Sequence, residues 1–118
     1  MDFQTERMNI TAQANGGALI VTVDENRIDA AVAVAFKDKV NELAGSEPKR
    51  VILDLKNVDF LDCSGLGAVV AVMKLLGQER KLELASLRPA VEKVFKLTRM
   101  DSVFSIHADI GAAIPAAA

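Results

Sequence analysis

Strand-like and helix-like segments alternate along this 118-residue chain, and that alternation restricts its fold more than any other feature. Apolar residues recur at every second position, or in short and nearly continuous runs, at 8–13, 18–23, 51–55, 82–87 and 103–107, which predicts strands. They recur every three or four positions at 29–44, 66–76, 90–98 and 110–114, which predicts helices.

The order of these segments predicts the class of fold. The first two strands are separated by Asn15-Gly16-Gly17, a turn signal that favours an antiparallel hairpin. Each later strand follows a helix, and such crossover connections produce parallel strands. We therefore expect an α/β fold with a mostly parallel sheet of four to five strands, an antiparallel N-terminal edge strand and about four helices.

Composition narrows the class of protein further. The length suits a single domain, taken here as 1–118 with a core at about 8–114 and flexible ends. A net charge of −2, with both signs interspersed, disfavours binding to nucleic acid or to a membrane surface. The one cysteine forms no internal disulfide, and the polar segment 1–10 lacks the apolar stretch of a signal peptide. These features predict a soluble, cytoplasmic protein.

The segment F60-L-D-C-S-G-L-G67 places polar and small residues between the buried strand 51–55 and a helix expected from about residue 65. In open α/β sheets, binding sites gather at the carboxyl ends of parallel strands, where helix N-termini also offer free N–H groups. Two interpretations stay open from the residues alone. Ser64 could cap the helix, or its hydroxyl could be presented for modification or contact, with Gly65 and Gly67 permitting close approach.

The same segment resembles the D-x-S-G-L-G signature of STAS domains, the family of the anti-sigma factor antagonists. R27-I-D29 resembles the family's G-x-L-D segment, although Asn26 replaces the glycine, and V51-I-L-D-L55 resembles its buried strand. S86-L-R-P-A-V-E-K-V-F-K-L97, followed by V103-F-S-I106, resembles its strand, Pro-led helix and closing strand. The resemblance spans about residues 8–114 and implies a single STAS domain.

The resemblance also implies a function. In phosphorylatable members, the serine before G-L-G is phosphorylated by an ATP-dependent anti-sigma factor serine kinase, and Ser64 holds that position. A bacterial antagonist of this kind is not an enzyme: it binds the kinase when unmodified, releases it when phosphorylated and is restored by a serine phosphatase. It thereby regulates sigma-factor-dependent transcription. The partner-binding residues implied are Asp29, Asp62, Cys63, Ser64, Gly65, Leu66 and Gly67, with no cofactor and no metal.

One alternative keeps the same fold. A STAS scaffold or accessory subunit, as in stressosome-like or lipid-transport assemblies, would use this surface for constitutive binding. A weak nucleotide site also stays open, although the chain lacks the G-x-x-x-x-G-K-[ST] pattern of a phosphate-binding loop.

Two catalytic interpretations are disfavoured. Ser64, Asp101 and His107 stand in the order of an α/β-hydrolase triad, but the nucleophile elbow needs glycine two residues before and after its serine. Cys63 is expected to be a small packed side chain rather than a redox sensor, since the chain has no second cysteine to resolve an oxidised thiol.

The remaining polar residues are expected to have structural roles. His107 is expected to be a surface or hydrogen-bonded residue, since no second histidine exists to share a metal. Asp54, near the end of a buried strand, is expected to hydrogen-bond a neighbouring loop. A solvated helix face is expected to carry Lys93, Lys96 and Arg99.

Overall fold

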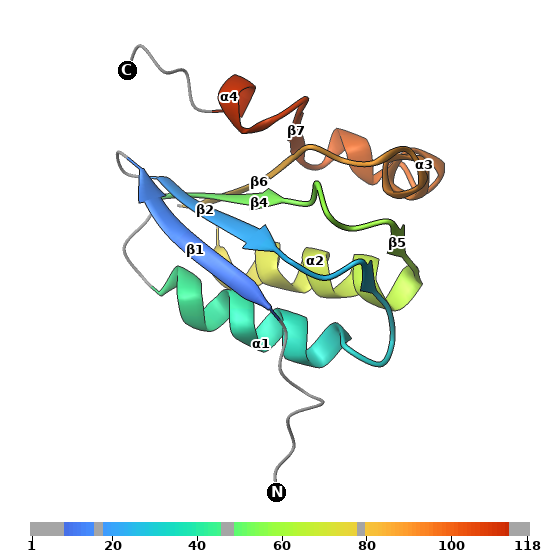
Figure 1. Cartoon of the computed structure of the whole chain (residues 1–118), viewed down its shortest axis with the longest axis horizontal. Coiled ribbons are helices and arrows are strands. Elements are labelled where there is room, and N and C mark those ends of the chain that lie inside the picture. Colours follow the sequence, from blue (N-terminus) through green and yellow to red (C-terminus); the bar gives the residue numbers. More distant parts are fainter. Residues whose placement is uncertain (1–8, 16–17, 46–48, 78–79, 114–118) are drawn as a thin grey trace, which may run out of the picture.

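The computed structural model of the protein describes residues 9–15, 18–45, 49–77 and 80–113 (Figure 1). The strands are β1 (Ile10–Asn15), β2 (Ala18–Val23), β3 (Arg27–Ile28), β4 (Arg50–Asp54), β5 (Phe60–Leu61), β6 (Lys81–Ala85) and β7 (Ser105–His107). The helices are α1 (Ala33–Ala44), α2 (Cys63–Leu76), α3 (Pro89–Leu97) and α4 (Ile110–Ala113), with a 3-10 helix, η2, at Met100–Ser102.

Five strands form one sheet in the order β1-β2-β4-β6-β7. β1 is antiparallel to β2, and every other neighbouring pair is parallel. This arrangement confirms the predicted α/β class, the mostly parallel sheet and the antiparallel edge strand. Of the turn predicted at 15–17, residues 16 and 17 lie outside the described residues.

A second, two-stranded ladder was not predicted. β3 and β5 run parallel, and Ile28 pairs with Leu61. Each strand has only two residues, which is too short to show a sequence period by itself. The ladder matters because each of its strands leads directly into a segment of the candidate site.

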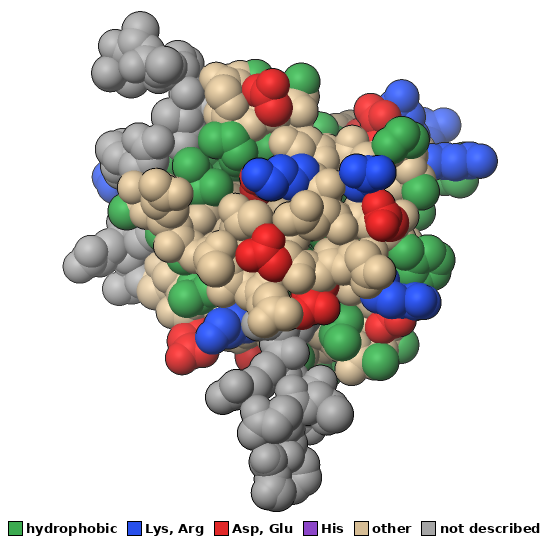
Figure 2. Space-filling view, viewed as in Figure 1, with side chains coloured by type: hydrophobic (Ala, Val, Ile, Leu, Met, Phe, Trp, Pro, Cys, Tyr) green, Lys and Arg blue, Asp and Glu red, His purple; other side chains and the backbone are tan. Residues whose placement is uncertain are grey.

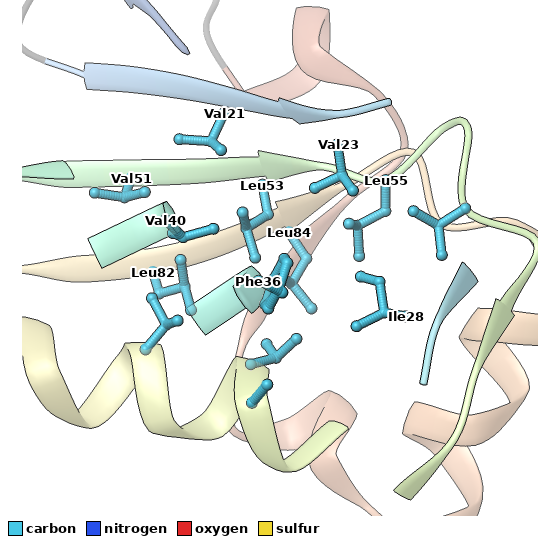
Figure 3. Packing of buried hydrophobic residues seen from close by; sticks show 14 of the residues in the cluster. Val21, Val23, Ile28, Phe36, Val40, Val51, Leu53, Leu55, Leu82 and Leu84 are labelled. Carbon is cyan, nitrogen blue, oxygen red and sulfur yellow. The ribbon is translucent and has the colours of Figure 1, made fainter. Parts of the chain in front are cut away.

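Helices α1 and α2 lie side by side on one face of the sheet (Figure 1). Figure 3 shows Val51 and Leu53 of β4 turned toward this helical layer, where Phe36 and Val40 of α1 are fully buried. Aliphatic side chains, with Phe36 among them, fill most of the space between sheet and helices in this chain without Trp or Tyr. Removing this layer from water is the main driving force for the fold.

The opposite face of the sheet is also covered at its centre. Ile52, which alternates with Val51 and Leu53, packs there with Ala18 and Ala85, and Ile110 of α4 contacts this cluster. Burial on both faces explains the nearly continuous apolar run at 51–55, which only Asp54 interrupts.

Helix boundaries differ from the prediction at the N-terminal ends. Residues 29–32 form a turn rather than the first turn of α1, because the Asp29 carboxylate accepts the N–H of Ala31 at 3.1 Å. The carbonyl of Asp29 accepts the N–H of Val32 at 3.0 Å. At their C-terminal ends α1 and α2 stop as predicted at Gly45 and Gly77, both with positive φ.

The described surface carries charges of both signs. Figure 2 shows Lys and Arg side chains interspersed with Asp and Glu over the visible face. Among the described residues, no helix has both the length and the apolar character needed to span a bilayer.

Candidate functional site

The predicted site residues come from two segments that the β3–β5 ladder holds together. Ile28 pairs with Leu61, and the N–H of Asp62 donates to the Ile28 carbonyl at 3.3 Å. Residues that follow the two strands therefore lie side by side. Asp29 and Asp62, far apart in sequence, each directly follow one of these paired strands. Figure 1 shows that α1 and α2, which come next along the chain, begin at the same end of the molecule.

Asp62 is the N-cap of α2. Its backbone is extended, and its Oδ1 accepts the N–H of Gly65 at 2.9 Å. Its Oδ2 accepts the N–H of Ala30 at 3.3 Å, so the same carboxylate also fastens the loop that precedes α1. The interpretation of Ser64 as the cap is therefore wrong. A cap must stand in non-helical backbone just before the first turn, and Asp62 occupies that position.

Ser64 is the second residue of α2 and is exposed. Among the described residues, its hydroxyl has no hydrogen-bond partner. The N–H groups of Gly65 and Leu66 bond to Asp62, whereas those of Cys63 and Ser64 have no protein partner within the described ranges. An anion attached to Ser64 would therefore lie near unpaired N–H groups and the positive end of the helix dipole.

The two glycines after Ser64 have different surroundings. Gly65 is buried against β3, and a Cβ added there would lie 2.2 Å from the carbonyl oxygen of Ile28. Gly67 is exposed, and a Cβ added there would meet nothing within 4 Å. At Gly65, the group that comes close to the helix is β3 of the protein itself. Gly67 is therefore the glycine whose missing side chain leaves room on the exposed surface for another molecule.

The first turn of α2 divides the predicted motif between core and surface. The buried side of the whole helix is formed by Gly65, Leu66, Ala68, Val69, Val72 and Leu76. This arrangement turns Cys63, Ser64 and Gly67 outward, and all three are exposed. The expectation of a packed Cys63 thiol is therefore wrong, because the helical period places that residue on the side away from the core.

Sequence reasoning missed two residues beside the site. Phe60 is 45% exposed, and the guanidinium carbon of Arg27 lies 4.9 Å from the centre of its ring. Arg27 Nε donates to Asp29 Oδ2 at 2.9 Å. The matching triplets R27-I-D29 and F60-L-D62, each with one buried residue between two outward ones, were the signal that could have found this pair.

His107 belongs to a different cluster. Its Nε2 lies 2.7 Å from Glu83 Oε1, and the buried Glu83 carboxylate also accepts two hydrogen bonds from Arg50, at 2.6 and 2.8 Å. The Arg50 hydrogen bonds lower the pKa of Glu83 against the opposing effect of burial, with a smaller contribution from His107. His107 is thus hydrogen-bonded as predicted, and its ring faces Glu83 rather than Ser64.

The expectations for Asp54 and for the basic face of α3 are confirmed. Asp54 is buried, and its Oδ1 accepts the N–H of Lys56 in the following loop at 3.1 Å. The predicted basic face of α3 and the turn after it, Lys93, Lys96 and Arg99, is exposed. Within the described part of the chain, no group of three or more His, Cys, Asp or Glu side chains could hold a metal ion.

Residues 9–113 match the family model of the STAS domain. This chain belongs to the STAS-domain family. A STAS-domain containing protein from Pseudomonas aeruginosa is 30% identical over 102 residues, which cover 84% of this chain and 99% of that protein. Anti-sigma-F factor antagonist RsfB of Mycobacterium tuberculosis is 21% identical over 105 residues, which cover 89% of this STAS protein and 85% of RsfB.

Solved structures share the STAS fold. The crystal structure of an anti-sigma factor antagonist from Mycobacterium paratuberculosis matches with a TM-score of 0.82 at 24% identity, over 94% of each chain. The phosphorylated form of the Bacillus cell fate determinant SpoIIAA matches with a TM-score of 0.67 at 17% identity, over 92% of this chain and 99% of that one.

Proposed function

We propose that this STAS-domain protein is an anti-sigma factor antagonist switched by phosphorylation of Ser64. Unmodified, it binds an anti-sigma factor that is also an ATP-dependent serine kinase, and it releases that partner once Ser64 carries a phosphate. The observation that carries the proposal is the exposed Ser64 hydroxyl in the first turn of α2, which takes no part in capping because Asp62 is the cap. The similarity to the anti-sigma-F factor antagonist RsfB supports the proposed role, and the similarity to the phosphorylated form of SpoIIAA supports the proposed modification.

The surface offered to the partner has small, uncharged side chains at its centre. Cys63, Ser64 and Gly67 point outward from one turn of helix, and the partly exposed carboxylate of Asp29 lies at the edge. Gly65 and Leu66 are buried: Gly65 packs against β3 and Leu66 packs into the core, and both hold the first turn of α2 in place. A kinase active site could therefore approach the hydroxyl without meeting a bulky neighbour on α2.

In the modification step, the γ-phosphoryl group of ATP moves to Ser64 Oγ. A new P–O bond forms as the bond to the departing ADP oxygen breaks, and the hydroxyl proton passes to a base of the kinase. ATP and its Mg²⁺ belong to the kinase, and the chain itself contributes only the positioned hydroxyl. A serine phosphatase reverses the step by transferring the phosphoryl group to water. This cycle takes place in the cytoplasm, where ATP is supplied.

Release follows from the charge that the phosphate adds. A phosphoserine carries about −1.5 to −2 charges at neutral pH. The free chain tolerates this anion because the helix dipole and nearby unpaired N–H groups favour it by up to about 1 kcal/mol. In the docked state the phosphate loses water and lies near the carboxylates of Asp62 and Asp29. A net penalty of several kcal/mol weakens binding more than a hundredfold.

The test uses the purified chain and each anti-sigma factor serine kinase encoded in the same genome, purified separately. Incubation with Mg-ATP should place one phosphate on the peptide that contains Ser64, as read by mass spectrometry. Ser64→Ala should take up no phosphate, whereas Ser105→Ala, which removes another exposed serine, should be modified like the wild type. Modification at another serine, or none, would contradict the proposal.

Calorimetry then separates a switch from a constitutive scaffold. The wild type and Ser64→Ala should bind the kinase with similar affinity, and Ser64→Asp should bind at least tenfold more weakly. Equal binding of Ser64→Asp would favour a scaffold or accessory subunit that uses the same surface without regulation.

A further inference from the structure

The edge strand β1 has an unusual composition for a strand beside solvent. Residues 8–23, which include both strands of the hairpin, form the longest stretch of the sequence without a charged residue. In β1, the exposed residues are Thr11, Ala12, Gln13 and Ala14, none of them charged. A quarter of the whole chain is charged, so this neutral edge departs from the rest of the surface.

β1 also lacks the structural features that usually keep sheet edges apart. Natural proteins protect an edge with a short strand, a lysine, a proline or a bulge. β1 is six residues long, and all six pair with β2 in unbroken register. Its sequence, ITAQAN, contains neither Lys nor Pro. Among the described residues, β2 is its one strand neighbour, so the N–H and C=O groups of alternate residues point outward.

The other edge of the sheet is different. β7 has three residues, and its neighbour along the chain, α4, packs back against β7 and β4. His107 of β7 points toward the buried Glu83 on the next strand. β7 therefore has the short length and inward polar side chain of a protected edge, whereas β1 does not.

We propose that β1 pairs antiparallel with β1 of a second copy of this chain, which joins the two sheets into one of ten strands. A second copy suits this edge because antiparallel pairing brings a strand against its own sequence, and a neutral strand then faces no like charge. A two-fold axis near Ala12 or Gln13 keeps Ala12 and Ala14 of both copies on the helical side of the joined sheet, and Thr11 and Gln13 on the other. The alanines are small enough to leave the space beside α1 open.

The pairing leaves the STAS site available. Ser64 lies on α2, which packs under the middle of the sheet, whereas β1 forms the outer edge beyond β2. A dimer therefore displays two Ser64 surfaces and can hold two partner molecules at once. Because a six-residue edge is a small contact, we expect association in the weak, concentration-dependent class.

The test measures the mass of the 118-residue chain by sedimentation equilibrium from micromolar to millimolar concentration. The wild type should shift from single-chain mass to twice that mass. Thr11→Lys combined with Gln13→Lys places lysines opposite each other in each of these registers, and should raise the dissociation constant at least tenfold. Ser105→Lys, on the β7 edge, is the matched control and should dimerise like the wild type.

Hydrogen exchange locates the contact. Outward-pointing β1 amides should exchange more slowly as the wild-type concentration rises, and this dependence should vanish in the double lysine variant. Circular dichroism checks that the variant is folded. A wild type that stays monomeric throughout, a dimer unaffected by the two lysines, or open-ended assembly beyond the dimer would each overturn the proposal.

Discussion

Replacing Gly65 by Ala tests how closely α2 lies against β3. The added methyl carbon would lie 2.2 Å from the carbonyl oxygen of Ile28, whereas a carbon and an oxygen normally stay about 3.3 Å apart. A gap of roughly 1 Å must open. Ile28 is fully buried, so the carbonyl cannot yield without moving the core. Overpacking of this kind costs about 3 kcal/mol, and the better helix propensity of Ala offsets about 1 kcal/mol. The expected net loss is about 2 kcal/mol.

Gly67→Ala is the matched control, two residues further along the same helix. A Cβ there meets nothing within 4 Å, so the variant should be as stable as the wild type or more stable by up to about 1 kcal/mol. Urea and thermal denaturation followed by circular dichroism measure both variants, and Gly65→Ala should melt on the order of 8 °C below the wild type. If the two variants proved equally stable, the proposed contact between α2 and the Ile28 carbonyl would be refuted.

Two further predictions concern stability away from the site. Arg50 lowers the pKa of the buried Glu83, so Glu83 stabilises the fold above its unfolded-state pKa, and this contribution is lost as pH falls through the folded-state value. Glu83→Gln should cost about 2 kcal/mol at pH 7 and much less at pH 3, and a constant difference across urea titrations at these pH values would contradict this. Arg99 has a left-handed backbone just after α3, with φ of 64°, so Arg99→Gly should raise the free energy of unfolding by about 0.5–1 kcal/mol. Arg99→Ala, which keeps the Cβ, should bring no such gain in the same denaturation assay.

The architecture was predictable because each main element is long enough to show its period. The run at 51–55 indicated a strand buried on both faces, and the structure places Ile52 against one layer and its neighbours against the other. The start of α1 was less predictable. Asp29 carries the acidic side chain that often precedes a helix, but its carboxylate closes a local turn with Ala31 instead, and the helix begins at Ala33.

The site was predictable in its residues but not in their roles. Ser64 and Asp62 both have side chains that cap helices well, and Asp62 is the cap because its backbone is extended just before the first turn, where its carboxylate also holds Ala30, far away in sequence. The same holds for Gly65, whose need for a missing Cβ comes from the carbonyl of Ile28 on another strand. Local sequence shows that a small or polar residue is present, whereas tertiary neighbours decide what it does.

The two bonds of Asp62 affect how mutational data on this protein should be interpreted. One carboxylate oxygen holds the start of α2 and the other holds the loop before α1. A mutational scan that scored partner affinity alone would assign Asp62 a part in recognition, although an Ala variant could lose affinity only because the two segments drift apart. Asp29 presents the same difficulty, because its own carboxylate accepts the N–H of Ala31 and closes the turn before α1. Ser64, whose hydroxyl has no hydrogen-bond partner among the described residues, is the cleaner position at which to separate the effect of surface charge from that of shape.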